Sequence, residues 1–205
     1  MRVAIVGGTG AFGSALARRL AEAEIEVTIG SRDANRAAAT AADVGAARGL
    51  ENADAVQGAD LVILSADASA AFPTVLTLAD ALGELPILSV ASELRILGGI
   101  ALPGPDPLSL AERLQQVHRG PVVAGLHSLA ARSLEAGKAE GDALVCGDDE
   151  AAKAAALELA EKLVTGRALD AGPLASARAL EGMTAVIVNL NRRYRGHAGL
   201  RIEGL

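Results

Sequence analysis

The amino-terminal half of the chain alternates between short apolar runs and longer segments in which apolar residues recur every three or four positions. The short runs predict buried strands at 2–7, 26–30, 59–66 and 86–91. The longer segments predict amphipathic helices at 13–23, 33–45 and 68–83. Strands that alternate with helices in this way predict an α/β fold, a doubly wound parallel sheet of Rossmann type with right-handed crossovers.

The pattern breaks at 92–107, which contains three prolines and three glycines. We expect a mobile loop there, of the kind that often acts as a lid. The pattern then resumes, and it predicts helices at 107–117, 148–164 and 173–191 and strands at 121–127, 142–147 and 167–172. No linker separates the two halves. We therefore expect a Rossmann domain over 1–120 and a small C-terminal α/β domain over 121–205 that packs directly on it and closes the cleft.

Composition removes two classes of protein from consideration. Hydrophobic residues make up 51% of the 205 residues, which is enough for a large core. The formal net charge is −6, and the aromatic residues are two Phe and one Tyr. The chain therefore lacks the basic surface and stacking side chains of a nucleic-acid-binding protein. No apolar run approaches the roughly 20 residues of a membrane span, so we expect a cytoplasmic protein with neither a nucleic-acid nor a membrane partner.

The stretch "VAIVGGTGAFGSALA" (3–17) joins the first strand to the first helix with the spacing G-x-G-x-x-G. In a dinucleotide-binding turn the first glycine permits the tight turn and the second lets the backbone approach a pyrophosphate. The third lets the helix pack closely on the strand, and the helix directs its free N–H groups at the phosphates. We expect a nucleotide site rather than a purely structural corner. The expected contacts are Gly8, Thr9, Gly10, Ala11, Phe12 and Gly13.

The tip of the second strand indicates which dinucleotide is bound. An NAD site usually has Asp or Glu there to accept a hydrogen bond from the ribose 2′-OH, but this chain reads "IGSRD". Ser31 and Arg32 suit a 2′-phosphate, which Arg pairs bidentately. Arg36 adds charge one helical turn later, and Thr9 is a further donor. These residues favour NADP(H) provided that Asp33 points away; the alternative is that Ser31 only caps the helix.

The remaining reactive side chains do not predict a metal site or a catalytic triad. His118, His127 and His197 are scattered along the sequence, and Cys146 is the one cysteine. The acidic run 148–150 is typical of a helix N-terminus. Only His127 stands at the end of a predicted strand, where open α/β sheets bind ligands. We therefore expect no metal, and His127 is either a ligand contact or a hydrogen-bonded structural histidine.

Two later stretches carry a resemblance to a known family. "GLHSLAARSL" (125–134) and the segment from "LVCGDD" through "LDAGPLASARALEGMTAVIVNLN" (144–191) resemble the second half of the F420H2:NADP+ oxidoreductase family. "MRVAIVGGTGAFGSALARRLA" and "IGSRD" are similar to that family's nucleotide half, and the resemblance is weakest at 92–120. It implies an oxidoreductase that passes hydride between NADP(H) and coenzyme F420, an 8-hydroxy-5-deazaflavin, in a cleft between two domains.

The resemblance implies the same phosphate-binding residues and adds contacts near the reacting rings. Ser65 and Ala66, at the tip of the third strand, would line the nicotinamide, and Ala91 at the tip of the fourth is a further cofactor contact. His127 and Ser128 would touch the deazaflavin. Such hydride transfer needs the two rings held about 3–3.5 Å apart rather than a metal or a triad.

The chain departs from the family pattern on the acceptor side. The third strand ends in "LSAD" and the histidine is followed by "SLA", where the family commonly has Thr-Ile-Pro, and the fourth strand lacks a proline that the family often carries. Alternative functions are therefore the reduction of another flavin, of ferric iron, or of a small imine or carbonyl. A non-catalytic NADP(H) sensor is the alternative from a different class.

The last predicted helix is apolar over much of its surface and therefore needs burial on more than one side. We expect a homodimer through this helix, consistent with the homodimers of the family. The segment "NRRYRGHAGLR" (191–201) follows it and holds four arginines. They either receive the phosphate and acidic tail of coenzyme F420 or form a solvated helix end.

Overall fold

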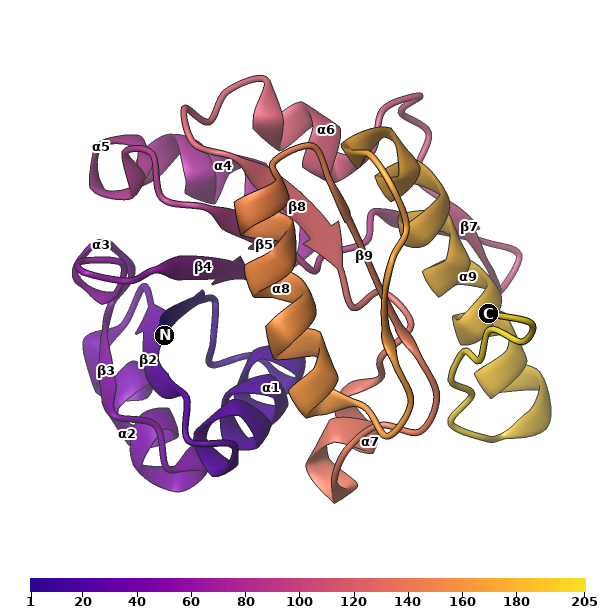
Figure 1. Cartoon of the computed structure of the whole chain (residues 1–205), viewed down its shortest axis with the longest axis horizontal. Helices are drawn as coiled ribbons and strands as arrows, with labels where there is room; N and C mark the ends of the chain where they lie inside the picture. Colours follow the sequence, from indigo (N-terminus) through magenta and orange to yellow (C-terminus); the bar gives the residue numbers. More distant parts are fainter.

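The computed structural model describes residues 1–205, and a single eight-stranded sheet runs through the molecule (Figure 1). The strand order is β10-β9-β8-β5-β4-β1-β2-β3, and the strands from β8 to β3 are parallel. The strands are β1 (Arg2–Val6), β2 (Glu26–Ser31), β3 (Arg48–Glu51), β4 (Leu61–Leu64), β5 (Ile87–Ser89), β8 (Val122–Gly125), β9 (Ala143–Gly147) and β10 (Ala168–Asp170). The doubly wound fold predicted from the alternating pattern is confirmed.

Helices cover both faces of this sheet. One face carries α1 (Ala11–Glu22), α2 (Ala34–Val44), α7 (Ala131–Ala136) and α8 (Glu150–Leu163). The other carries α4 (Ala68–Thr77), α5 (Ala79–Leu82), α6 (Leu110–Gln115) and α9 (Ala177–Tyr194), which follows a short 3₁₀ turn, Leu174–Ser176. None of the helices combines the length and the apolar character needed to cross a membrane.

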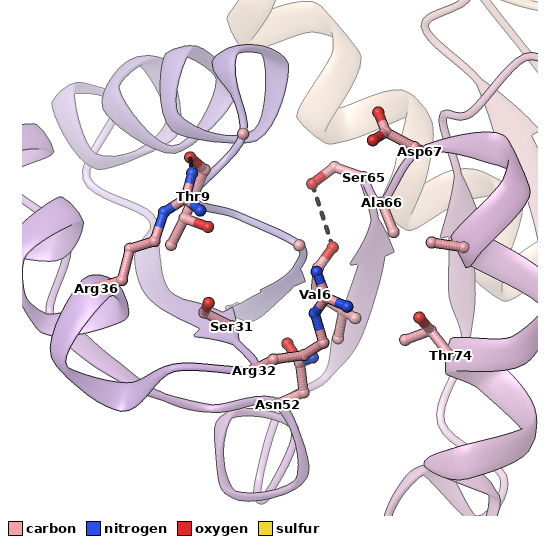
Figure 2. Close-up of a pocket in the computed structure, with 13 residues that line it drawn as sticks. Val6, Thr9, Ser31, Arg32, Arg36, Asn52, Ser65, Ala66, Asp67 and Thr74 are labelled. Carbon is pink, nitrogen blue, oxygen red and sulfur yellow. Dashed lines mark hydrogen bonds between the residues drawn. The ribbon is translucent and has the colours of Figure 1, made fainter.

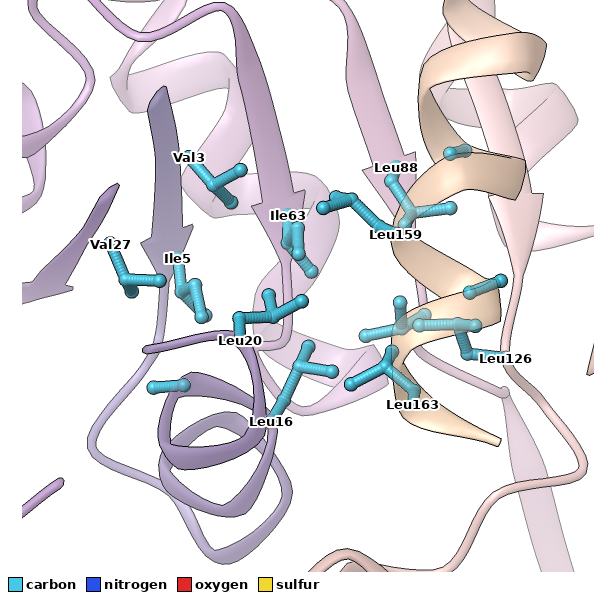
Figure 3. Packing of buried hydrophobic residues seen from close by; sticks show 14 of the residues in the cluster. Val3, Ile5, Leu16, Leu20, Val27, Ile63, Leu88, Leu126, Leu159 and Leu163 are labelled. Atoms are coloured by element: carbon cyan, nitrogen blue, oxygen red, sulfur yellow. The ribbon is translucent and has the colours of Figure 1, made fainter. Parts of the chain in front are cut away.

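The core is divided between the two faces because side chains alternate along each strand. In β1, Val3 and Ile5 pack against α1 and α8, while Ala4 and Val6 face the opposite layer. Figure 3 shows the first layer, in which leucines of α1 and α8 meet the strand side chains. Burial on both faces explains why β1 and β4 appear in the sequence as continuous apolar runs.

The sequence also sets the ends of α2. The Asp33 carboxylate accepts hydrogen bonds from the backbone N–H groups of Asn35 (2.9 Å) and Arg36 (3.2 Å), which caps the helix. Gly45 ends it in the left-handed conformation (φ 75°). The helix predicted at 33–45 is therefore confirmed. The carboxylate of Asp33 is already hydrogen-bonded to backbone N–H groups of this helix.

The segment 92–107 differs from the expected loop. It contains a β-hairpin of β6 (Leu94–Leu97) and β7 (Ile100–Pro103). The Asn189 side chain of α9 donates to the Ala101 carbonyl and accepts from its N–H, each at 2.8 Å. The expectation of an irregular loop was wrong, because Gly98 and Gly99 form the turn of a hairpin that is bonded to α9.

Three further elements were missed, and a fourth was placed differently. Edge strand β3 and the short helix α3 (Asn52–Ala55) were not predicted, and neither was α7. The helix predicted at 68–83 is divided at Leu78, and Pro73 lies inside α4. The sheet also continues across residue 120 through the pairing of β5 with β8, so the division into two domains stays a prediction.

The strands β9 and β10 run opposite to the rest of the sheet, because β9 pairs antiparallel with β8 and β10 runs parallel to β9. The "CGDD" and "DAGPL" stretches therefore lie at the edge where the parallel strands begin. There Asp148 accepts from the Leu174 N–H (2.9 Å), and Asp170 pairs with the buried Lys153 (3.1 Å). These two stretches therefore connect strands β9 and β10 to the helices that follow them in the C-terminal half.

Candidate active site

The glycines after β1 make a tight and closely packed turn. The left-handed conformation falls on Gly7 (φ 77°). The Gly8 N–H donates to the carbonyls of Ile5 (3.1 Å) and Gly30 (3.0 Å), which joins the turn to the tip of β2. A Cβ added at Gly13 would lie 2.6 Å from the Ser65 Oγ and 2.8 Å from the Gly8 Cα. A Cβ added at Gly8 would lie 2.8 Å from the Ile5 carbonyl oxygen, so packing alone requires both the first and the third glycine of the motif.

Gly10 has a different environment from its neighbours. It is the residue before α1, with extended backbone and no side chain to cap the helix. A Cβ added there would meet only the Gly7 carbonyl oxygen, at 3.6 Å. The first-turn N–H groups of α1 are therefore open to an anion, as in dinucleotide-binding turns.

A cavity of about 200 Å³ lies over the tips of β1, β2 and β4 (Figure 2). It brings together seven of the residues predicted to bind the cofactor: Thr9, Gly10, Ser31, Arg32, Arg36, Ser65 and Ala66. The remaining predicted turn residues, Gly8, Ala11, Phe12 and Gly13, do not line it. Phe12 instead packs against the core, beneath the turn.

The β2 side of this cavity is rich in donors. Arg36 reaches back from α2 and donates to the Thr9 carbonyl at 3.2 Å, and Arg32 is exposed on the far side of Ser31, beside Asn52 (Figure 2). The Ser31 Oγ accepts from the Asp33 N–H at 3.2 Å. Because the Asp33 carboxylate caps α2, no carboxylate at the β2 tip is free to accept from a ribose 2′-OH. This arrangement suits the additional phosphate of NADP.

Four lining residues with polar or small side chains were not predicted: Asn52, Asp67, Ala70 and Thr74. Asn52 begins α3 and lies beside Arg32, whereas Asp67 and Thr74 face them from the β4–α4 side (Figure 2). A Cβ at Gly30 would lie 2.8 Å from the Asn52 Oδ1, so the missing side chain at 30 makes room for this amide. Asn52 was not identified from the sequence because it follows β3, an edge strand that was not predicted.

The second part of the site lies at the tips of β5 and β8. Leu126, at the end of β8, has a left-handed backbone (φ 65°) although it is a bulky residue. The next residue, His127, is buried, and neither ring nitrogen has a hydrogen-bond partner. Burial lowers the pKa of His127 to about 4, and the backbone of Ala91, which is near the ring but outside hydrogen-bond geometry, opposes that shift only weakly. The predicted pair His127 and Ala91 thus lie together, and the imidazole is neutral near pH 7.

The backbone of His127 is tied to α9 and to the segment after β5. The Thr184 hydroxyl donates to the His127 carbonyl at 3.0 Å. The Ser92 and Thr184 hydroxyls lie 2.7 Å apart in a hydrogen bond. The position of His127 is therefore fixed by elements that are far apart in the sequence, and neither hydroxyl was singled out from the sequence.

Ser128 does not share a cavity with the predicted nucleotide residues. Its buried Oγ donates to the Asp142 carbonyl at 3.3 Å, and it lines a separate cavity of about 400 Å³ beyond β8. Cys146 is buried in β9, where burial raises the pKa of its thiol to about 12, so it is not a reactive thiolate.

These features together define a class of protein. A glycine-rich turn, an open helix N-terminus and a cationic β2 tip lie at the carboxyl edge of a doubly wound sheet. That is the arrangement of a Rossmann-type dinucleotide-binding protein.

Comparisons with known proteins define the family. A family model described as "NADP oxidoreductase coenzyme F420-dependent" matches residues 2–93. An F420-dependent NADP reductase of Methanothermobacter thermautotrophicus is 34% identical over 222 aligned residues, which cover 100% of this chain and 96% of that protein. The enzyme of the same name from Methanocaldococcus jannaschii is also 34% identical and is covered to 99%. The chain belongs to the F420-dependent NADP oxidoreductase family.

Solved structures agree with this fold. A crystal structure from Arthrobacter sp. FB24, described as an F420-dependent NADP reductase, superposes with a TM-score of 0.85 at 26% identity, and 100% of each chain is covered. An imine reductase from Aspergillus terreus superposes with a TM-score of 0.66 at 21% identity, over 95% of this chain and 63% of that one. The second likeness shows a shared fold alone.

Proposed function

We propose that this chain is an oxidoreductase that transfers hydride between NADP(H) and coenzyme F420. The observation that carries the proposal is the placement of two sites on one edge of the sheet. A cavity with a cationic β2 tip lies at one end of that edge, and a buried neutral histidine lies at the other. Membership of the F420-dependent family supports the identity of both reactants.

The residues of the first cavity fit NADP(H). Ser31, Arg32 and Arg36 would hold the 2′-phosphate, with Thr9 beside them, because charged donors there face no competing carboxylate at the β2 tip. The N–H groups that follow Gly10 would receive the pyrophosphate. NADPH supplies a hydride when it is bound.

The residues at the tips of β4, β5 and β8 would position the reacting rings. Ser65 is fixed by donating to the Val6 carbonyl at 3.2 Å, and with Ala66 it would border the nicotinamide. Ala91, His127 and neighbouring Ser128 would contact the deazaflavin. A neutral imidazole keeps one N–H to donate to an acceptor atom, and its burial excludes water from the place of transfer.

The proposal is tested by turnover. Purified protein is mixed with NADPH and oxidised coenzyme F420, and the visible absorbance of the deazaflavin is followed. We expect the absorbance to decay with NADPH and much more slowly with NADH. Parallel reactions with a flavin and with a cyclic imine serve as comparisons. No decay with the deazaflavin in either direction of reaction would refute the proposal.

We further propose that the protein acts in the cytoplasm as a homodimer. The hairpin and α9 form one surface through the bonds between Asn189 and Ala101. That surface exposes large apolar side chains, namely Ile96, Leu97, Ile100, Val186, Leu190 and Tyr194. Light scattering on the eluting protein tests the dimer, and Val186→Glu is expected to yield a monomer. A monomeric unaltered protein would contradict this proposal.

A further inference from the structure

The cavity beyond β8 has no role in the function proposed so far. It is about 400 Å³ in volume and lies between α7, the loop that follows α7 and the C-terminal segment. Its lining includes Ser128, Arg132, Ser133, Lys138, Glu140 and His197. The cavity is large enough for a flexible polar group, and it opens on the surface rather than into the core.

The charged groups of this cavity are available to a ligand. Neither Arg132 nor Lys138 forms an ion pair or a side-chain hydrogen bond within the protein. Glu140 is the single carboxylate in the lining, so cations outnumber it. In a chain of net charge −6, two unpaired cations around one cavity favour an anionic ligand.

The position of the cavity connects it to the proposed acceptor site. Ser128 lines it and directly follows His127, whose ring lies beside Ala91. Both cavities lie on the edge of the sheet where the parallel strands end. A ligand whose ring contacts His127 therefore has this cavity within reach on the side away from the nucleotide.

One wall of the cavity is fixed by a network around Asp142. The Asp142 N–H donates to the Leu200 carbonyl at 2.6 Å, and its carboxylate accepts from the Ile202 N–H at 2.8 Å. Arg167 pairs with the same carboxylate at 3.1 Å. These bonds hold Leu200 and Ile202, which follow His197, in place before a ligand arrives, so less ordering of this segment is required on binding.

We propose that this cavity binds the anionic tail of the electron acceptor, the phosphate and carboxylate groups attached to the deazaflavin ring. The inference rests on the proposed function, because it assigns a place to a part of the same substrate. Arg132 and Lys138 pair with the anionic groups, and the hydroxyl of Ser133 is a further donor. The tail adds affinity without contacting the reacting atoms.

The arginines at the end of α9 do not offer an equivalent site. Arg192 lies near Gly99 of the hairpin turn, and Arg193 lies over the Tyr194 ring at 5.9 Å. Arg201 lines a separate cavity that also contains Asp142. Of the two groups of cations considered, only Arg132 and Lys138 line the cavity that Ser128, the residue next to His127, also lines.

The test compares two substrates on one variant. Arg132→Ala/Lys138→Ala is assayed with NADPH and either complete coenzyme F420 or its 8-hydroxy-5-deazaflavin core without phosphate and carboxylates. We expect the ratio of the KM for the complete coenzyme to the KM for the core to rise about tenfold, because two charged contacts are lost. Added salt should raise that ratio in the unaltered protein and much less in the variant.

The matched control is Arg48→Ala/Arg119→Ala, which removes the same charge at the opposite edge of the sheet, where these residues pair with Glu26 and Asp80. It should leave the KM ratio unchanged. Circular dichroism and NADPH affinity check that both variants fold. An unchanged ratio in the cavity variant, or an equal change in the control, overturns the inference. Failure of the unaltered protein to reduce either substrate overturns the proposed function instead.

Discussion

At the tips of β1, β2 and β4 polar groups line an open cavity, whereas at the tips of β5 and β8 a histidine ring is buried with no partner for either nitrogen. The first region is made mostly of residues close in sequence to one glycine-rich turn and the strand after it. The second is assembled from Ala91, His127 and Thr184, which come from three distant segments. The difference shows that one edge of a sheet can carry two kinds of site. The residues of one are mostly close together in the sequence, and the residues of the other are brought together only by the packing of distant segments.

The largest expected effect concerns the local site. In Gly13→Ala the new methyl would lie 2.6 Å from the Ser65 Oγ and 2.8 Å from the Gly8 Cα, and such overpacking costs about 3 kcal/mol of unfolding free energy. Gly10→Ala is the matched control, because its methyl has no contact closer than 3.6 Å. It should cost less than about 1 kcal/mol while it weakens NADPH binding. Urea denaturation of both variants measures the difference, and equal destabilisation would contradict the separate roles of the two glycines.

A second change separates phosphate recognition from general nucleotide binding. Arg32→Ala should weaken NADPH binding by roughly 1 to 3 kcal/mol, because a charged hydrogen bond to the 2′-phosphate is lost. NADH lacks that phosphate and should bind with unchanged affinity. Titration of both dinucleotides by calorimetry measures the two values. Equal binding of NADH and NADPH by the unaltered protein would remove the basis of the cofactor preference.

The burial of His127 at the tips of β5 and β8 is tested by a change of pH. The unfolded chain protonates His127 near pH 6.5, but the folded chain does so only near pH 4. The contribution of this residue to stability is therefore complete above pH 6.5 and is lost as the pH falls toward 4. Between pH 7 and pH 5 the unaltered protein should lose about 2 kcal/mol that His127→Gln does not lose. Denaturation curves at both pH values test this, and an identical pH dependence in the two proteins would show that the ring is not buried as a neutral group.

The smallest effect is expected at the fixed C-terminal segment. The N–H groups of Ile202 and Arg167 hold the pKa of the Asp142 carboxyl at about 2, with the guanidinium of Arg167 acting in the same direction. Asp142→Asn removes the charge and should speed hydrogen exchange of the Ile202 amide while leaving the core amides unaffected. Asp43→Asn, which alters an exposed pair with Arg18, is the control. No change in exchange at Ile202 would mean that the carboxylate does not hold the segment.

The same comparison explains what the sequence reveals in advance. The turn, the cationic β2 tip and the alternating elements were predicted because short-range spacing encodes each of them. Strand β3 carries one large apolar residue, Leu50, and lies at the sheet edge, so it has no alternating signal. Asn52 follows that strand and was missed with it. The hairpin at 94–103 was missed because its glycines and prolines are typical of an irregular loop. The hydroxyls of Ser92 and Thr184 were missed because residues so far apart in the sequence form no motif.

The reversal at β9 has a consequence for how this protein can change. The stretches that most clearly carry the family resemblance, around Asp148 and Asp170, anchor the C-terminal half at the edge opposite the chemistry. If the proposed acceptor site is correct, separate groups of residues encode the shape of the C-terminal half and the choice of reaction partner. On that proposal, replacing side chains around Ala91 and Ser128 would change the electron acceptor and leave the contacts of Asp148 and Asp170 intact.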